Sequence, residues 1–137
     1  MLPFTPRLRL AIASAEALAS SQQRLEVSPL DLLAGILSLG SGLAVGVLKA
    51  KGFTESDGAA AASHQSTLDD TPTSYTAEAL TALSGAILEA VSRSHELVGV
   101  EHMLVGILTQ PSAEISALLA QKNVKREELL STLRAEM

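Results

Sequence analysis

Two histidines and two glutamates stand close together in the second half of the chain and are its main candidates for chemistry. The pairs His95-Glu96 and Glu101-His102 are separated by a short apolar segment, residues 97–100. A histidine beside a carboxylate can transfer protons or bind a metal ion. The spacing does not match the His-Glu-x-x-His helix of zinc hydrolases, and a loop is expected between the two histidines. We therefore predict no metal site, and a small metal-dependent or acid–base hydrolase that uses Glu101 and His102 is the enzymatic alternative.

Other motifs of catalysis or cofactor binding are not found in the sequence. It contains no Gly-x-x-x-x-Gly-Lys-Ser/Thr loop for ATP and no Gly-x-Ser-x-Gly turn with a triad candidate. Cysteine is absent, so disulfides and thiolate metal sites are excluded. His64 lies in a polar segment and is expected to be a solvated loop residue. The prediction is a protein without catalytic residues and without a cofactor.

The Glu101-His102 pair belongs to a stretch, residues 98–108, that resembles an earlier stretch, residues 27–37. Both begin at a valine and end in Gly-Ile-Leu. At the start of a helix, a carboxylate is favoured by the helix dipole by about 0.3–1 kcal/mol, and this alone can explain Glu101. His102 is expected to be half-buried and hydrogen-bonded to the backbone. A role of Glu101 in binding a partner is the alternative to this structural explanation.

The similarity extends over most of the chain. Residues 4–53 align with residues 75–124 without a gap, and thirteen of the fifty aligned pairs are identical. The shared positions are those expected to cap helices, to break them or to lie in the core. We predict an all-α protein, a single domain over residues 1–137 in which two pseudo-symmetric four-helix repeats form one eight-helix bundle. Its repeats span residues 4–62 and 75–137, and the polar segment 63–74 links them.

The helix boundaries follow from capping residues. Thr5, Ser28, Ser41, Thr76 and Ser112 each precede an apolar periodic segment and are predicted N-caps. A weaker pattern predicts a helix over residues 55–62. The helix after Thr76 is expected to turn five apolar residues inward: Leu80, Leu83, Ile87, Ala90 and Val91.

One glycine interrupts the helix predicted after Ser28. Gly35 disfavours a helix by up to about 1 kcal/mol. We therefore expect a neighbouring helix to approach closely at Gly35.

Composition limits the class of protein further. The formal net charge is −5 and the pI is about 5.1, which argues against a nucleic-acid partner because phosphates require a basic surface. No apolar run approaches the roughly 20 residues that span a bilayer, and residues 1–7 lack the pattern of a signal peptide. We expect a cytoplasmic protein that binds neither nucleic acid nor membrane.

The order of these features resembles the double Clp N-terminal domain, which heads the Clp AAA+ protein unfoldases and also occurs in small stand-alone relatives. The resemblance is carried by the Phe-Thr-Pro-Arg start at residues 4–7 and by Gly-Val-Glu-His-Met-Leu-Val-Gly-Ile-Leu at residues 99–108. It implies an all-α fold of eight helices in two halves. It also implies a non-catalytic module that docks substrates or adaptors for an unfoldase or its peptidase.

The resemblance also implies candidate binding residues. In some Clp unfoldases the glutamate before the histidine helps to hold phosphorylated arginine on marked substrates, and this glutamate corresponds to Glu101. In the first repeat the same positions hold Leu30 and Asp31, and the threonine of the family's start corresponds to Thr5 and Thr76. We predict a tentative peptide-binding set of Thr5, Leu30, Thr76, Glu101 and His102, with one phosphoarginine site at most.

Two versions of the function stay open at this point. The chain is either an N-terminal domain of a larger unfoldase or a free-standing modulator of a Clp complex. A purely structural helical oligomer is a third alternative.

Overall fold

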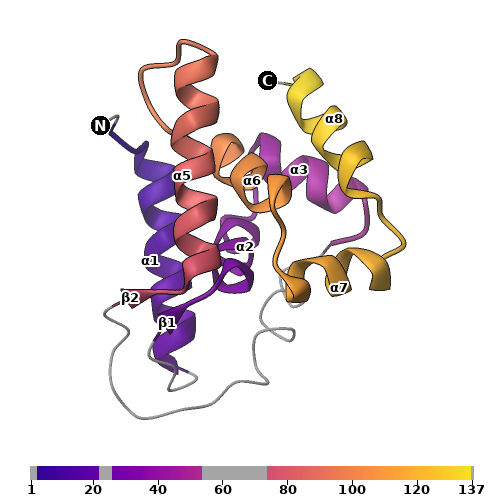
Figure 1. Cartoon of the computed structure of the whole chain (residues 1–137), viewed down its shortest axis with the longest axis horizontal. Coiled ribbons are helices and arrows are strands. Elements are labelled where there is room, and N and C mark those ends of the chain that lie inside the picture. The colour runs from indigo at the N-terminus through magenta and orange to yellow at the C-terminus, as the bar shows by residue number, and fades with distance from the viewer. Residues whose placement is uncertain (1–2, 22–25, 54–73, 137) are drawn as a thin grey trace.

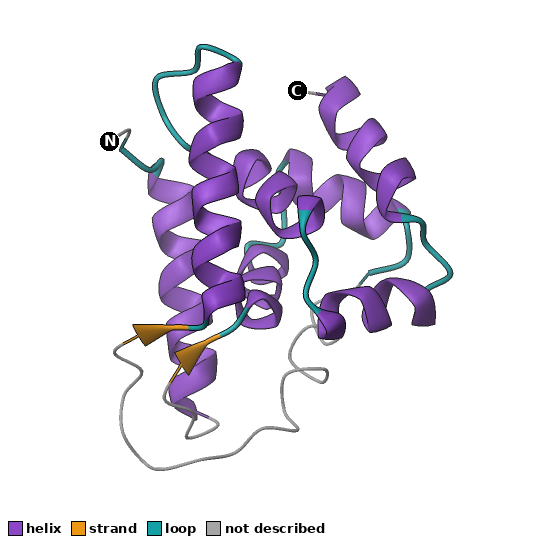
Figure 2. Cartoon of the chain, in the orientation of Figure 1, coloured by secondary structure: helices purple, strands orange, loops and turns teal. Residues whose placement is uncertain are grey.

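The structure is a computed structural model that describes residues 3–21, 26–53 and 74–136. Within these ranges it contains seven α-helices and one small parallel sheet (Figures 1 and 2). The elements in chain order are α1 (Pro6–Ser21), β1 (Glu26–Val27), α2 (Pro29–Ser38), α3 (Leu43–Ala50), β2 (Ser74–Tyr75), α5 (Ala77–Ser92), α6 (Val100–Thr109), α7 (Ala113–Gln121) and α8 (Arg126–Glu136). The predicted all-α class is confirmed. The helix predicted over residues 55–62 and the loop around His64 lie outside the described residues.

Side-chain caps start four of the helices as predicted. The hydroxyl oxygens of Thr5 and Thr76 each accept a hydrogen bond of 3.1 Å from the backbone N–H three residues later. Ser112 caps α7 in the same way, with a bond of 3.3 Å. Ser28 and Asp31 form a complete capping box at the start of α2. These short-range interactions fix where α1, α2, α5 and α7 begin.

The predicted cap at Ser41 is wrong. The N-cap of α3 is Gly42, and no side chain caps that helix. The chain turns sharply at this point, because Gly40 and Gly42 have φ values of 76° and 108°, a conformation that suits glycine. The turn moves the helix start one residue past Ser41, so the first N–H groups of α3 lack a side-chain partner.

Each half of the chain is tied to the helix entry of the other half. β1 pairs with β2 in parallel, and the Thr76 N–H donates to the Val27 carbonyl at 3.0 Å. Phe4 forms an isolated parallel bridge with Val98, and the Thr5 N–H donates to the Val98 carbonyl at 2.9 Å. The start of α1 therefore lies beside the start of α6, and the start of α5 lies beside the start of α2.

Two glycines allow the long helices to pack closely in the core. A Cβ atom added at Gly35 of α2 would lie 2.1 Å from the carbonyl oxygen of Ala11 in α1. A Cβ atom added at Gly106 of α6 would lie 2.1 Å from the carbonyl oxygen of Ala82 in α5. The close helix approach predicted at Gly35 is confirmed. The opposing faces of the long helices are lined by small residues that are buried: Ala11, Ala15 and Ala19 in α1, and Ala79, Ala82, Ala86 and Ala90 in α5.

This packing overturns part of the predicted core. Leu80 and Val91 were expected to point inward, but they are 53% and 55% exposed. Since Gly106 brings the backbones together, only alanine side chains fit between α5 and α6. The larger side chains of α5 are therefore displaced to the sides of the helix and to its outer face.

The described helices were also compared with the requirements for crossing a bilayer. None of them is long and apolar enough to cross alone. The consecutive pairs α2 with α3 and α6 with α7 meet the length and composition test together, but they are bent by 102° and 97°.

The glycine contact can be tested by adding one methyl group. We expect Gly106→Ala to lower the free energy of unfolding by about 1–3 kcal/mol, because the new Cβ overlaps the Ala82 carbonyl and α5 must move. Urea denaturation measures this change. Gly46→Ala in α3 is the control, since outside its own stretch of helix no atom of the described residues lies within 4 Å of its added Cβ. The control should be neutral or stabilising by up to about 1 kcal/mol. Equal effects of the two substitutions would contradict this packing model.

Candidate binding site between the two halves

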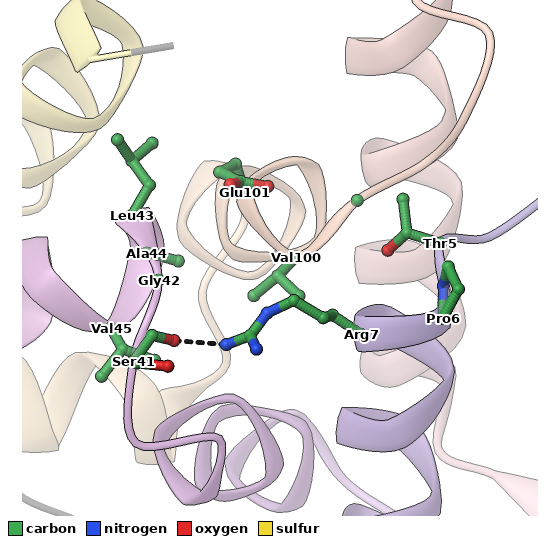
Figure 3. Close-up of a pocket in the computed structure, with 11 residues that line it drawn as sticks. Thr5, Pro6, Arg7, Ser41, Gly42, Leu43, Ala44, Val45, Val100 and Glu101 are labelled. Carbon is green, nitrogen blue, oxygen red and sulfur yellow. Dashed lines mark hydrogen bonds between the residues drawn. The ribbon is translucent and has the colours of Figure 1, made fainter.

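Three helix starts, those of α1, α3 and α6, meet around a pocket of about 330 Å³ (Figure 3). Helix α1 contributes residues 5–7, α3 with its preceding turn contributes residues 41–45, and α6 contributes residues 99–101. The positive ends of three helix dipoles therefore face one cavity, an arrangement that favours a negatively charged group. We refer to this cavity as the inter-repeat pocket.

One cationic and one anionic side chain line this pocket. The Arg7 guanidinium reaches across from α1 and donates a hydrogen bond to the Ser41 carbonyl (Figure 3). Glu101 stands in the first turn of α6 and is half-buried. The pocket can therefore meet both signs of charge in one ligand, an anion at the helix starts and a cation at the carboxylate.

His102 is buried behind Glu101 and supports the start of α6. Its Nδ1 accepts a hydrogen bond of 2.8 Å from the Gly99 N–H, and its Nε2 lies 2.7 Å from Nδ1 of His95. Burial lowers the pKa of His102, and the neighbouring His95 lowers it further. The expectation that His102 bonds to the backbone is confirmed. This histidine stabilises the helix start that presents Glu101.

A second cavity of about 260 Å³ opens on the other side of Glu101. It is lined by Leu43, His95, Glu101, His102 and Glu136. Although both histidines line it, no three acidic or histidine side chains among the described residues are arranged to hold a metal ion. The geometry therefore gives no support to the metal-dependent hydrolase considered above.

The corresponding positions in the first half are occupied differently. Leu30 is only 1% exposed and belongs to the core, so it does not present a surface. Asp31 replaces the histidine, and its carboxylate accepts hydrogen bonds from the Ser28 N–H at 2.8 Å and the Ser28 hydroxyl at 3.1 Å. Thr76 caps α5 beside Val27. Of the five predicted residues, Thr5 and Glu101 share the inter-repeat pocket, with His102 behind it, and Leu30 and Thr76 lie elsewhere.

Sequence reasoning missed the contribution of Arg7 and of the α3 start to this pocket. The signal that could have predicted this contribution is the Gly40-Ser41-Gly42 turn. A glycine N-cap has no side chain that can accept hydrogen bonds from the first N–H groups of the helix. That turn marks a helix start available to a ligand.

A separate surface feature lies on α5. Its outer face carries Leu80, Leu88 and Val91, which are 53%, 69% and 55% exposed. Leu83 and Ile87 flank them and are partly buried. With 3.6 residues per turn, these five side chains lie on one side of α5, away from its acidic residues Glu78 and Glu89. We refer to the five residues as the α5 apolar face.

Comparison with known proteins identifies the fold. Residues 74–137 match the family model of the Clp repeat N-terminal domain. No curated protein matches the chain by sequence.

Solved structures resemble nearly the whole chain. The Hsp104 N-terminal domain of Candida albicans aligns with a TM-score of 0.81 at 16% identity, over 96% of this chain and 89% of that one. The ClpV N-domain of Vibrio cholerae aligns with a TM-score of 0.73 at 19% identity, over 96% of this chain and 85% of the ClpV chain. A ClpV N-domain in complex with a VipB peptide aligns with a TM-score of 0.71 at 20% identity, over 94% of this chain and 88% of the ClpV chain. Residues 74–137 therefore match a Clp N-terminal repeat, and the chain as a whole has the fold of the Clp N-terminal domains.

Proposed function

We propose that this chain is a non-catalytic module that docks protein substrates or adaptors for a Clp-type unfoldase or protease. The observation that carries the proposal is the α5 apolar face. Exposed apolar side chains that gather on one face mark interaction surfaces more often than scattered ones do. An amphipathic or extended segment of a partner can bury its own apolar residues against such a helix.

The five-residue apolar face lies in one half of the chain, whereas in α1 Leu10 is the one large apolar side chain that is exposed, at 58%. In α1, the residues aligned with Leu80, Ile87 and Leu88 are Arg9, Glu16 and Ala17, respectively. Helices α1 and α5 both bury alanines, α1 against α2 and α5 against α6. The two helices therefore differ in polarity on their outer sides. A requirement of the fold would apply to both repeats, whereas a docking surface is needed on only one of them.

The likeness to a peptide complex supports the same proposal. The ClpV N-domain, which shares this fold, was solved with a VipB peptide. That structure establishes peptide binding for ClpV alone. For the present chain, the chemistry of the α5 apolar face defines the partner as an unfolded or helical segment with clustered apolar side chains.

Removing this face should weaken docking. We expect the double substitution of Leu88→Ser and Val91→Ser to weaken binding of fluorescein-labelled β-casein, an unfolded protein, by at least about tenfold, because two exposed apolar contacts are lost. Fluorescence anisotropy measures the affinity. Ala17→Ser, at the α1 position that corresponds to Leu88, is the matched control and should not change it. Unaltered casein binding by the double variant would reject the α5 apolar face as the docking surface.

The inter-repeat pocket supports a second and finer proposal, a single site for phosphoarginine. The phosphoryl group suits the three helix starts, and the guanidino N–H groups suit the Glu101 carboxylate. Thr5 lines the same pocket and comes from the other half of the chain. In the first half the glutamate is replaced by Leu30, which is buried, so an equivalent second site lacks its carboxylate.

Calorimetry with free phosphoarginine tests this pocket. We expect one binding site per chain, and Glu101→Ala should abolish binding because the guanidino group loses its anionic partner. Glu96→Ala is the control, since Glu96 is exposed in the connection before α6 and does not line the pocket. Two equal sites, or unchanged binding by Glu101→Ala, would count against the assignment.

The identity of the Clp partner is a separate question. The same surface serves either an N-terminal domain of an unfoldase or a free-standing modulator of a Clp complex. Affinity capture from the native cell should recover an unfoldase, a peptidase or an adaptor, and the reading frame after Met137 distinguishes the two versions.

A further inference from the structure

The two histidines near the start of α6 form a bonded pair that joins two helices. The His95 backbone is fixed at the end of α5, where its N–H donates to the Ala90 carbonyl at 2.9 Å, after Ser94 with a φ of 58°. His102 belongs to α6. Their ring nitrogens approach to 2.7 Å, with ring centroids 4.9 Å apart. The pair therefore connects the end of α5 directly to the start of α6.

The hydrogen bonds determine where the protons are. His102 accepts the Gly99 N–H at Nδ1, so this nitrogen carries no proton and the neutral ring holds its proton on Nε2. The Nε2–H then donates to Nδ1 of His95, which must also be bare. The neutral pair thus satisfies the Gly99 N–H and the inter-ring bond at the same time.

An added proton breaks one of these two bonds. On His95 it must occupy Nδ1, where it meets the Nε2–H of His102 and removes the inter-ring bond. On His102 it must occupy Nδ1, where it meets the Gly99 N–H and removes the helix cap. Neither imidazolium ion can keep the arrangement of the neutral pair, because both of its nitrogens are donors.

The surroundings contain charges of both signs. Glu101 on α6 and Glu89 on α5 favour a protonated His102, whereas Arg93 at the end of α5 opposes it. Glu89 is bound by Arg93 at 2.7 Å and by Arg134 of α8 at 3.3 Å. Glu136 of α8 lines the same cavity as the two histidines. With burial included, the net effect is a lowered pKa for His102.

We infer that the His95–His102 pair is a proton-operated latch that holds the start of α6 at neutral pH and releases it on acidification. Histidine in an unfolded chain titrates near pH 6.5. Because the latched state binds protons less readily than the open state, opening is favoured as the pH falls below about 6.5. The first turn of α6 carries Glu101, so the latch also controls how the inter-repeat pocket is presented.

The first half of the chain supplies an internal control. Asp31 occupies the position of His102, and its carboxylate caps the Ser28 N–H at 2.8 Å. A carboxylate is an acceptor only and keeps its hydrogen bond without choosing between ring tautomers, as a histidine must. The two aligned helix starts therefore differ in the side chain that accepts the bond, and only the second contains the histidine pair.

Amide hydrogen exchange of the wild-type chain, followed by NMR from about pH 7.5 to about pH 5, tests the latch. After correction for intrinsic exchange, we expect the protection of the Gly99 amide to fall at least about tenfold, while the protection of the Ser28 amide is nearly constant. In the His102→Asn variant the amide oxygen can accept the same bond without titrating, and the Gly99 amide should follow Ser28. A parallel fall at both amides, constant protection of Gly99 in the wild type, or a persisting fall in the Asn variant would overturn the inference.

Discussion

The contact of Gly35 with α1 and of Gly106 with α5 is the constraint on which the rest of this fold depends. Each glycine lets two helix backbones meet at a distance that a Cβ atom would prevent. The buried face of α5 carries alanines, and that of α1 carries three alanines and Leu8. At these two contacts, dispersion between closely packed backbones and alanines takes the place of large side chains, whereas leucine and isoleucine fill the rest of the core.

The surface chemistry follows from the same constraint. Because the inner face of α5 accepts only small residues, Leu80, Leu88 and Val91 are exposed, and together with the partly buried Leu83 and Ile87 they form the α5 apolar face. The pairing of Thr5 with Val98 places the start of α1 beside that of α6, and the turn at Gly42 adds the start of α3. The molecule therefore combines an apolar helix face on its second half with a charged pocket between the two halves. The first half has Leu30 and Asp31 at the positions that hold Glu101 and His102 in the second half.

Local interactions were predictable from the sequence, and long-range ones were not. The caps at Thr5, Ser28, Thr76 and Ser112 depend on a side chain and an N–H three residues away, so the residue types suffice. The cap predicted at Ser41 was wrong because the turn around this residue depends on two glycines with positive φ values. Helix propensity correctly singled out Gly35, since an unfavourable residue inside a helix requires a reason.

The orientation of α5 shows why periodicity alone was insufficient. Its sequence has an alanine face and a leucine face, and both are apolar, so the larger residues were expected inside. The contact at Gly106 reverses this choice, and it involves a helix that begins after α5 has ended. The presence of Thr5 and Glu101 in one pocket likewise depends on pairing between the two halves of the chain. The sequence predicted Thr5 as an N-cap and Glu101 in the first turn of a helix, but not this pairing.

Methyl NMR of the protein, titrated with unlabelled β-casein, tests whether a single face of one repeat receives the partner. We expect chemical-shift changes to concentrate on the methyl groups of the α5 apolar face, with little change at those of Leu10, Ile12 and Leu18 in α1. Shifts spread equally over α1 and α5, or confined to α1, would contradict it.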